Sequence, residues 1–112
     1  MGDITVQEIF AGMKNNFLPE AAGDLQTKVA YVLDGEGGGA WTVKVADAKV
    51  EVTEGLEGKV DATVVASADD FVKVALGQSH PVSVLMTGRI RIEGDSFVVQ
   101  KLFGLFRPPK TS

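Results

Sequence analysis

Three features of the sequence could carry chemistry: a histidine, a pair of acidic residues and a glycine-rich run. His80 is the single histidine and cysteine is absent, which disfavours histidine or thiolate metal sites and a Ser-His-Asp triad. His80 directly precedes Pro81, a position that suits the cap of a helix better than contact with a ligand. Asp69 and Asp70 follow Ser67 in the first turn of a predicted helix, where the helix dipole favours negative charge. We therefore interpret these residues as structural.

The glycine-rich run Gly35–Gly39 could suggest a phosphate-binding loop. A phosphate loop needs a helix N-terminus after the glycines, and here an alternating strand pattern follows. The neighbouring acids Asp34 and Glu36 lack the further oxygen ligands of a calcium loop. Since no nucleophile can be paired with a general base, the sequence predicts a protein that is not an enzyme and uses no metal or cofactor.

Length and charge limit the classes of partner. The 112 residues suit one domain over 1–112, and 11 basic against 15 acidic residues, a net charge of -4, argue against a nucleic-acid partner. No apolar run is long enough to span a membrane. The lack of cysteine, of a basic leader and of a peroxisomal C-terminal signal leads us to expect a cytoplasmic location. Residues 107–112, which contain Pro108 and Pro109, are expected to form a flexible tail.

The first half of the chain changes from a helical to a strand period. Thr5 and Glu8 match a capping box, and apolar residues then recur at helical spacing until Pro19. From Leu25 the apolar residues alternate. The sequence predicts a helix over 6–17, a linker over 19–24, and hairpin-linked strands over 25–33, 41–45 and 49–53.

The second half predicts two strands and three helices. Ser67 and Asp95 are in position to cap helices that begin directly after them, and Pro81 suits the start of a short helix between these two. Alternation predicts strands over 62–66 and 89–93. The pattern indicates an α+β fold, with a five-stranded, mainly antiparallel sheet and helices packed on one of its faces.

The last helix carries more apolar residues than one buried stripe needs. Val98, Leu102 and Leu105 can face the sheet, which leaves Val99, Phe103 and Phe106 unassigned. Ordinary core packing would explain the surplus. A ligand, a partner chain or a membrane surface would also explain it.

The stretch from Asp61 to Phe106 resembles the sterol carrier protein 2 (SCP2) sterol-binding domain family. The resemblance rests on an acidic pair before Phe71, a helix that ends at Gly77, the short helix at Pro81, the run G-R-I-R-I-E-G-D and a final apolar helix. It extends upstream through the hairpin at 29–52. In the family an Asn stands before the proline, where this chain has His80.

The resemblance implies the same architecture, with the fifth strand joining the sheet beside the fourth. It also implies an apolar tunnel between sheet and helices that takes fatty acid, fatty acyl-CoA or sterol. It implies a non-enzymatic lipid carrier, with fatty acid or acyl-CoA favoured over sterol in a bacterium. The alternative is an interaction module whose last helix docks a second copy or a partner enzyme. The implied ligand-binding residues are Phe10, Met13, Phe17, Val29, Tyr31, Leu33, Phe71, Ala75, Leu76, Leu85, Met86, Phe97, Leu102 and Phe103.

Overall fold

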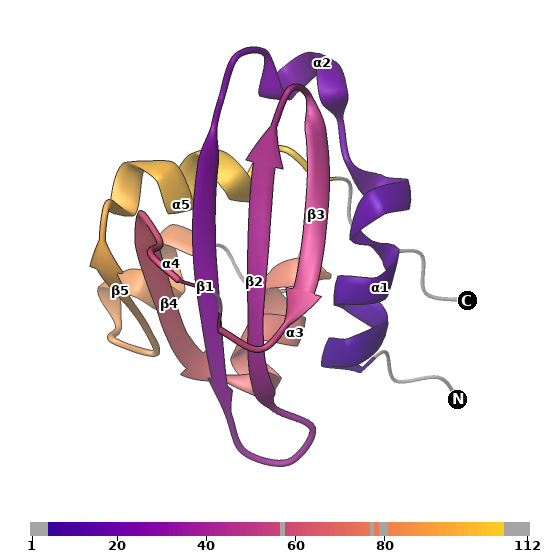
Figure 1. Ribbon diagram of the computed structural model, residues 1–112. Helices are drawn as coiled ribbons and strands as arrows, with labels where there is room; N and C mark the ends of the chain where they lie inside the picture. The colour runs from indigo at the N-terminus through magenta and orange to yellow at the C-terminus, as the bar shows by residue number, and fades with distance from the viewer. Residues whose placement is uncertain (1–4, 57, 77, 79–80, 107–112) are drawn as a thin grey trace.

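A five-stranded sheet with helices on one face forms the scaffold of the molecule (Figure 1). The computed structural model describes residues 5–56, 58–76, 78 and 81–106. The elements are α1 (Val6–Asn16), α2 (Pro19–Ala22), β1 (Thr27–Asp34), β2 (Gly39–Ala46), β3 (Lys49–Glu54), β4 (Ala62–Ser67), α3 (Ala68–Ala75), α4 (Pro81–Met86), β5 (Ile90–Gly94) and α5 (Ser96–Phe103).

The strand order is β3-β2-β1-β4-β5, so β3 and β5 are the two edges of the sheet. β1 and β4 pair in parallel at the centre, and the other neighbours pair antiparallel. The predicted α+β architecture, including β5 beside β4, is confirmed. Figure 1 shows α5 crossing behind the sheet and α1 lying alongside β3.

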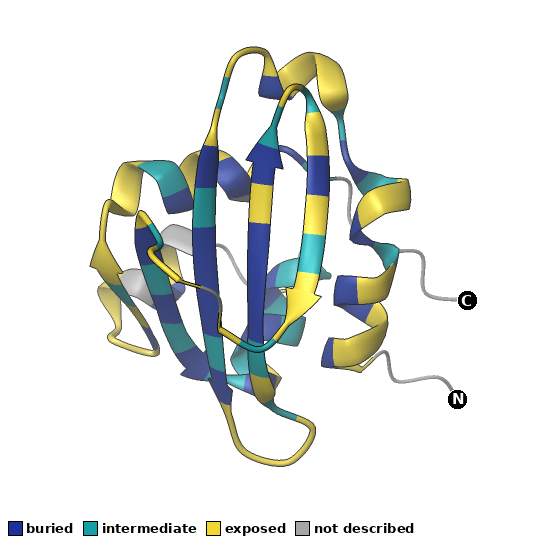
Figure 2. Cartoon of the chain, viewed as in Figure 1, coloured by how far each residue is buried: buried dark blue, intermediate teal, exposed yellow. Residues whose placement is uncertain are grey.

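Alternation along the strands decides which residues form the core. In β4, Ala62, Val64 and Ala66 are buried while the residues between them are only half-buried, a pattern visible in Figure 2. Val29 of β1 and Val43 of β2 face the same side and are fully buried. The side of the sheet that the helices cover is therefore the hydrophobic core.

Side-chain caps fix the starts of the main helices where the sequence predicts them. The Thr5 hydroxyl accepts from the Glu8 amide at 3.1 Å, and the Glu8 carboxylate accepts from the Thr5 amide in return. The Ser67 hydroxyl accepts from the Asp70 amide at 3.0 Å. Asp95 accepts two amide protons of the first turn of α5. Each cap satisfies amides that have no partner inside the helix.

Two local expectations are corrected. The linker expected at 19–24 contains the short helix α2, because Pro19 has the backbone angle of a first helical residue and lacks the amide that would go unpaired there. The β2–β3 turn lies at Asp47 and Ala48, one residue later than expected, with both residues at positive φ. His80 and the expected tail at 107–112 lie outside the described residues.

The buried face of α5 also differs from the prediction. The sequence left Val99 unassigned and placed Val98 toward the sheet, yet Val99 is fully buried together with Leu102 and Leu105, and Val98 is only half-buried. Phe106 packs beside Phe17, with 5.5 Å between ring centroids. Because the helix ends at Phe103, the residues after it no longer follow the helical period used to assign the faces.

Candidate functional site

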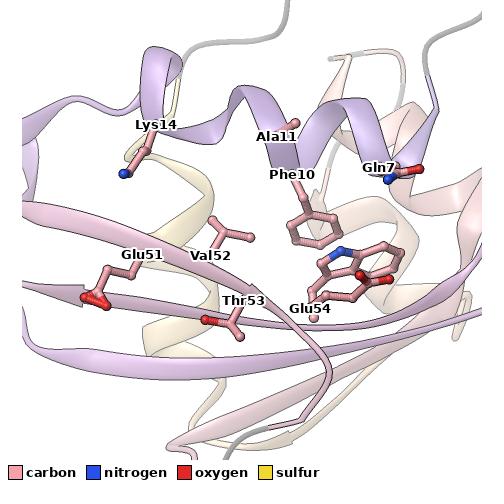
Figure 3. Close-up of a pocket in the computed structure, with 9 residues that line it drawn as sticks. Gln7, Phe10, Ala11, Lys14, Glu51, Val52, Thr53 and Glu54 are labelled. Carbon is pink, nitrogen blue, oxygen red and sulfur yellow. The ribbon is translucent and has the colours of Figure 1, made fainter.

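A groove of about 530 Å³ lies between α1 and β3 at one edge of the sheet (Figure 3). Its volume is within the range of small-molecule sites. It is lined by Gln7, Phe10, Ala11, Lys14, Trp41, Glu51, Val52, Thr53 and Glu54.

The apolar wall of the groove is part of a stack of aromatic rings. Phe10 lies parallel to Trp41, with 4.6 Å between centroids and 14° between planes. On its other side Phe10 lies parallel to Phe71, at 5.1 Å and 9°. The stack joins α1 to both β2 and α3, so the apolar wall is held in place by three elements.

Glycine at position 39 makes room for the indole of Trp41. A Cβ atom on Gly39 would lie 3.0 Å from the nearest ring atom of Trp41. A contact at this distance is tighter than ordinary van der Waals packing, so a side chain at Gly39 would displace the indole of Trp41. The glycine-rich run thus serves the groove indirectly, by seating Trp41.

Polar residues occupy both ends of the groove. Figure 3 shows Lys14 and Glu51 toward one end, and Gln7 and Glu54 toward the other. Gln7 and Lys14 are seven residues apart on α1, a rise of roughly 10 Å. The groove therefore has an apolar middle about two helical turns long between two polar, solvent-exposed ends.

Behind the apolar wall lies Tyr31, on the helix-covered side of β1. Its ring meets Phe10 and Phe71 edge-on, at centroid distances of 5.5 and 5.6 Å. Burial raises the pKa of the Tyr31 phenol well above its usual range, because the charged phenolate is poorly solvated there. The hydroxyl therefore stays protonated at any physiological pH.

Comparison with known proteins identifies the family. The model of the SCP-2 sterol transfer family matches residues 7–107, which is most of the chain. The chain belongs to the SCP-2 sterol transfer family. The resemblance found in the sequence is thereby confirmed.

Curated relatives of this SCP2 domain are longer proteins. Hydroxysteroid dehydrogenase-like protein 2 of Xenopus laevis is 33% identical over 99 residues, which is 87% of this chain and 24% of that protein. The chain thus spans about a quarter of the length of this relative.

Solved structures share the fold at low sequence identity. The sec-alkylsulfatase Pisa1 from Pseudomonas sp. aligns with a TM-score of 0.83 at 15% identity, over 96% of this chain and 17% of that one. Palmitated SCP2L2 from Aedes aegypti aligns with a TM-score of 0.68 at 20% identity, over 90% of this chain and 93% of that one. The chain therefore shares its fold with both proteins.

The residues implied by the family resemblance fall into five groups. Only Phe10 lines the groove. Met86 and Phe97 are 82% and 72% exposed, and the side chains of Leu85 and Phe103 lie outside the described part of the structure. Ala75 and Leu76 are half-buried. The buried members are Met13, Phe17, Val29, Tyr31, Leu33, Phe71 and Leu102.

Sequence reasoning did not find the other groove residues. Trp41 was predicted only as part of the strand over 41–45, and Lys14 only as part of the helix over 6–17. Only the structure shows that Val52, an apolar residue on the edge strand β3, is half-buried. A half-buried apolar residue at an edge marks a place where covering is incomplete.

Across residues 5–56, 58–76, 78 and 81–106, no three His, Cys, Asp or Glu side chains gather closely enough to hold a metal ion. Over the same residues, no helix has the length and apolar character needed to cross a bilayer.

Proposed function

We propose that this protein binds a long-chain lipid and carries it without altering it chemically. The observation that supports the proposal is the groove between α1 and β3, whose middle is formed by Phe10, Ala11, Trp41 and Val52. Apolar side chains of this kind favour a hydrocarbon ligand, because desolvation of the chain drives binding. Membership of the SCP-2 sterol transfer family supports the same conclusion.

The length of the groove sets how much of a lipid it can hold. With C–C bonds of about 1.5 Å at tetrahedral angles, an extended chain advances roughly 1.3 Å per carbon, so a length of about 10 Å covers roughly eight carbons. Burying eight methylenes contributes about 6 kcal/mol before the costs of association. A longer chain needs further apolar surface.

We propose that the remainder of a long chain enters the interior behind Phe10. The buried residues predicted from the family resemblance lie there, among them Tyr31 and Phe71, which both contact the Phe10 ring. A chain could reach them if the Phe10 side chain turned aside. The sequence-predicted lining and the groove would then be two parts of one site.

The ligand classes we propose are fatty acid, fatty acyl-CoA or a sterol-like lipid. The palmitated state of the Aedes aegypti protein supports a fatty acyl chain among these. We place the carrier in the cytoplasm, in line with its lack of cysteine. Because the Xenopus relative is a dehydrogenase-like protein four times as long, a partner enzyme that supplies or uses the lipid is part of the proposal.

The experiment that tests this proposal fills the groove. Ala11 is exposed on the groove side of α1, so Ala11→Trp places a large ring where the chain would lie. We expect its affinity for cis-parinaric acid, a fluorescent fatty acid, to fall about tenfold or more. Native mass spectrometry of the purified wild type should also release a long-chain lipid.

Ala21→Trp is the matched control. Ala21 is likewise an exposed helical alanine, but it lies on α2 and does not line the groove. Its affinity for the probe should equal that of the wild type. Equal affinities of all three proteins would remove the groove from the proposal, and a wild type that binds no lipid would refute the carrier function itself.

A further inference from the structure

The Tyr31 hydroxyl is a polar group placed inside an apolar environment. Tyr31 is 2% exposed and pairs in register with Trp41 of β2 and Val64 of β4. Its ring is packed edge-on against Phe10 and Phe71. A phenylalanine would supply the same ring at this position, so packing alone does not explain the oxygen atom.

No protein partner for this hydroxyl is found among the described residues. Neither a hydrogen bond nor an electrostatic interaction involves the Tyr31 oxygen there, and burial alone accounts for the raised pKa of the phenol. In the same set of residues no side-chain oxygen or nitrogen is both fully enclosed and unpartnered. The hydroxyl must therefore reach a space that a water molecule can enter.

An unpartnered hydroxyl in such a place favours a ligand that brings its own oxygen. A ligand that displaces water from this space removes the water's hydrogen bond to the hydroxyl unless the ligand brings an acceptor of its own. Phe10 contacts both the groove and the Tyr31 ring, so a chain that passes Phe10 comes next to Tyr31. The Tyr31 ring is thus next to the path that the proposed function gives to a long lipid.

We propose that Tyr31 donates a hydrogen bond to an uncharged oxygen of the bound lipid, such as an alcohol hydroxyl or an ester or thioester carbonyl. This inference rests on the proposed lipid-binding function and adds a polar requirement to it. An ionised carboxylate is excluded from this position, because burying it without a positive partner is costly. The register neighbours Trp41 and Val64 supply no positive charge.

The test compares Tyr31→Phe with the wild type for ligands that differ by one oxygen. Binding of 1-dodecanol and of dodecane is measured by displacement of cis-parinaric acid. We expect Tyr31→Phe to weaken dodecanol binding roughly 3- to 10-fold and to leave dodecane binding unchanged. Thr63→Val is the matched control, since it removes a half-buried hydroxyl from β4 on the face that the helices leave open.

Stability of the free protein gives a second readout. A hydroxyl that makes no hydrogen bond within the protein does not stabilise the unliganded fold. The free energy of unfolding of Tyr31→Phe should therefore equal or exceed that of the wild type. A clear loss of stability would show that the protein itself engages the hydroxyl, and would overturn the inference.

The outcomes separate the two proposals. If wild type and Tyr31→Phe bind dodecanol equally, the polar contact is refuted while the carrier function stands. If the wild type binds neither the fluorescent acid nor dodecanol, the carrier function fails, and the role of Tyr31 fails with it. A selective loss for dodecanol supports both.

Discussion

Phe17, directly after α1, pairs with Phe106, which follows α5 near the end of the described chain. They form an isolated antiparallel bridge, and their rings lie 5.5 Å apart between centroids. Next to them the Leu18 amide donates to the Leu105 carbonyl at 2.8 Å. The segment that follows α1 is thereby tied to the segment that follows α5, which holds α1 at the edge where the groove lies.

Phe106→Ala is expected to lower the free energy of unfolding by about 1–2 kcal/mol, because a half-buried ring and its aromatic contact are lost. Urea unfolding followed by circular dichroism measures this difference. Phe97→Ala removes the same side chain from a position that is 72% exposed, so it should change stability by less than about 0.5 kcal/mol. Equal effects of the two substitutions would show that the contact between the Phe17 and Phe106 rings does not stabilise the fold.

Two glycines should respond to alanine in opposite directions. Gly12 lies inside α1, and a Cβ there would only touch the Asn16 amide nitrogen at 3.5 Å. Gly12→Ala should therefore stabilise the protein by up to about 1 kcal/mol through its helix propensity. Thermal unfolding measures the gain, and a loss of stability would show that α1 needs the freedom of glycine.

A Cβ atom on Gly38 would lie 2.2 Å from the Leu33 carbonyl oxygen. Because the obstacle is backbone, the loop between β1 and β2 would have to move to admit it. We expect Gly38→Ala to cost about 2 kcal/mol, measured in the same thermal experiment as Gly12→Ala. A Gly38→Ala protein as stable as the wild type would disprove this close approach.

Asp61 makes the fold sensitive to acid. Its carboxylate accepts from the Thr27 hydroxyl at 2.7 Å and from the Lys28 amide at 3.1 Å. The hydrogen bond from Thr27, followed by the one from Lys28, holds the pKa of the Asp61 carboxyl below its usual value. Since the folded state favours the ionised form, its contribution is complete above the unfolded pKa of about 3.9.

This contribution should disappear as the pH falls below about 4, through the lowered pKa of Asp61 in the folded state. Asp61→Asn, which cannot ionise, should show a shallower fall in unfolding free energy between about pH 5 and pH 2. Urea titrations at several pH values measure both slopes. Identical slopes would mean that Asp61 has the same pKa in the folded and unfolded chains.

The fold was largely predictable because its signals are local. Thr5, Ser67 and Asp95 indicate where helices start, because each side chain caps amides only two or three residues further along the chain. Alternation along the strands gave the buried face of β1 and β2, and only short distances along the chain were needed. The family resemblance supplied the place of β5, which no local signal contains.

The candidate site was much less predictable, because it depends on how far apart two elements lie. Nothing in the sequence states that α1 leaves Val52 of β3 partly uncovered, so Lys14 and Trp41 were assigned to other roles. The buried face of α5 was hard to predict for a related reason. The prediction placed Leu105 by continuing the helical period past Phe103, where the helix ends. Within the helix Val99 and Leu102, three residues apart, share the buried face.

Trp41 offers a direct readout of where the lipid lies. It is the only tryptophan of the chain and lines the groove, so its fluorescence reports on this site alone. Bromine quenches indole fluorescence only near contact, so 9,10-dibromostearic acid should quench the emission in a saturable manner, whereas stearic acid should not. Quenching in the wild type that is lost in Val52→Asp, which puts a charge into the apolar middle of the groove, would place the chain there. Binding shown by native mass spectrometry without quenching would move the lipid away from Trp41.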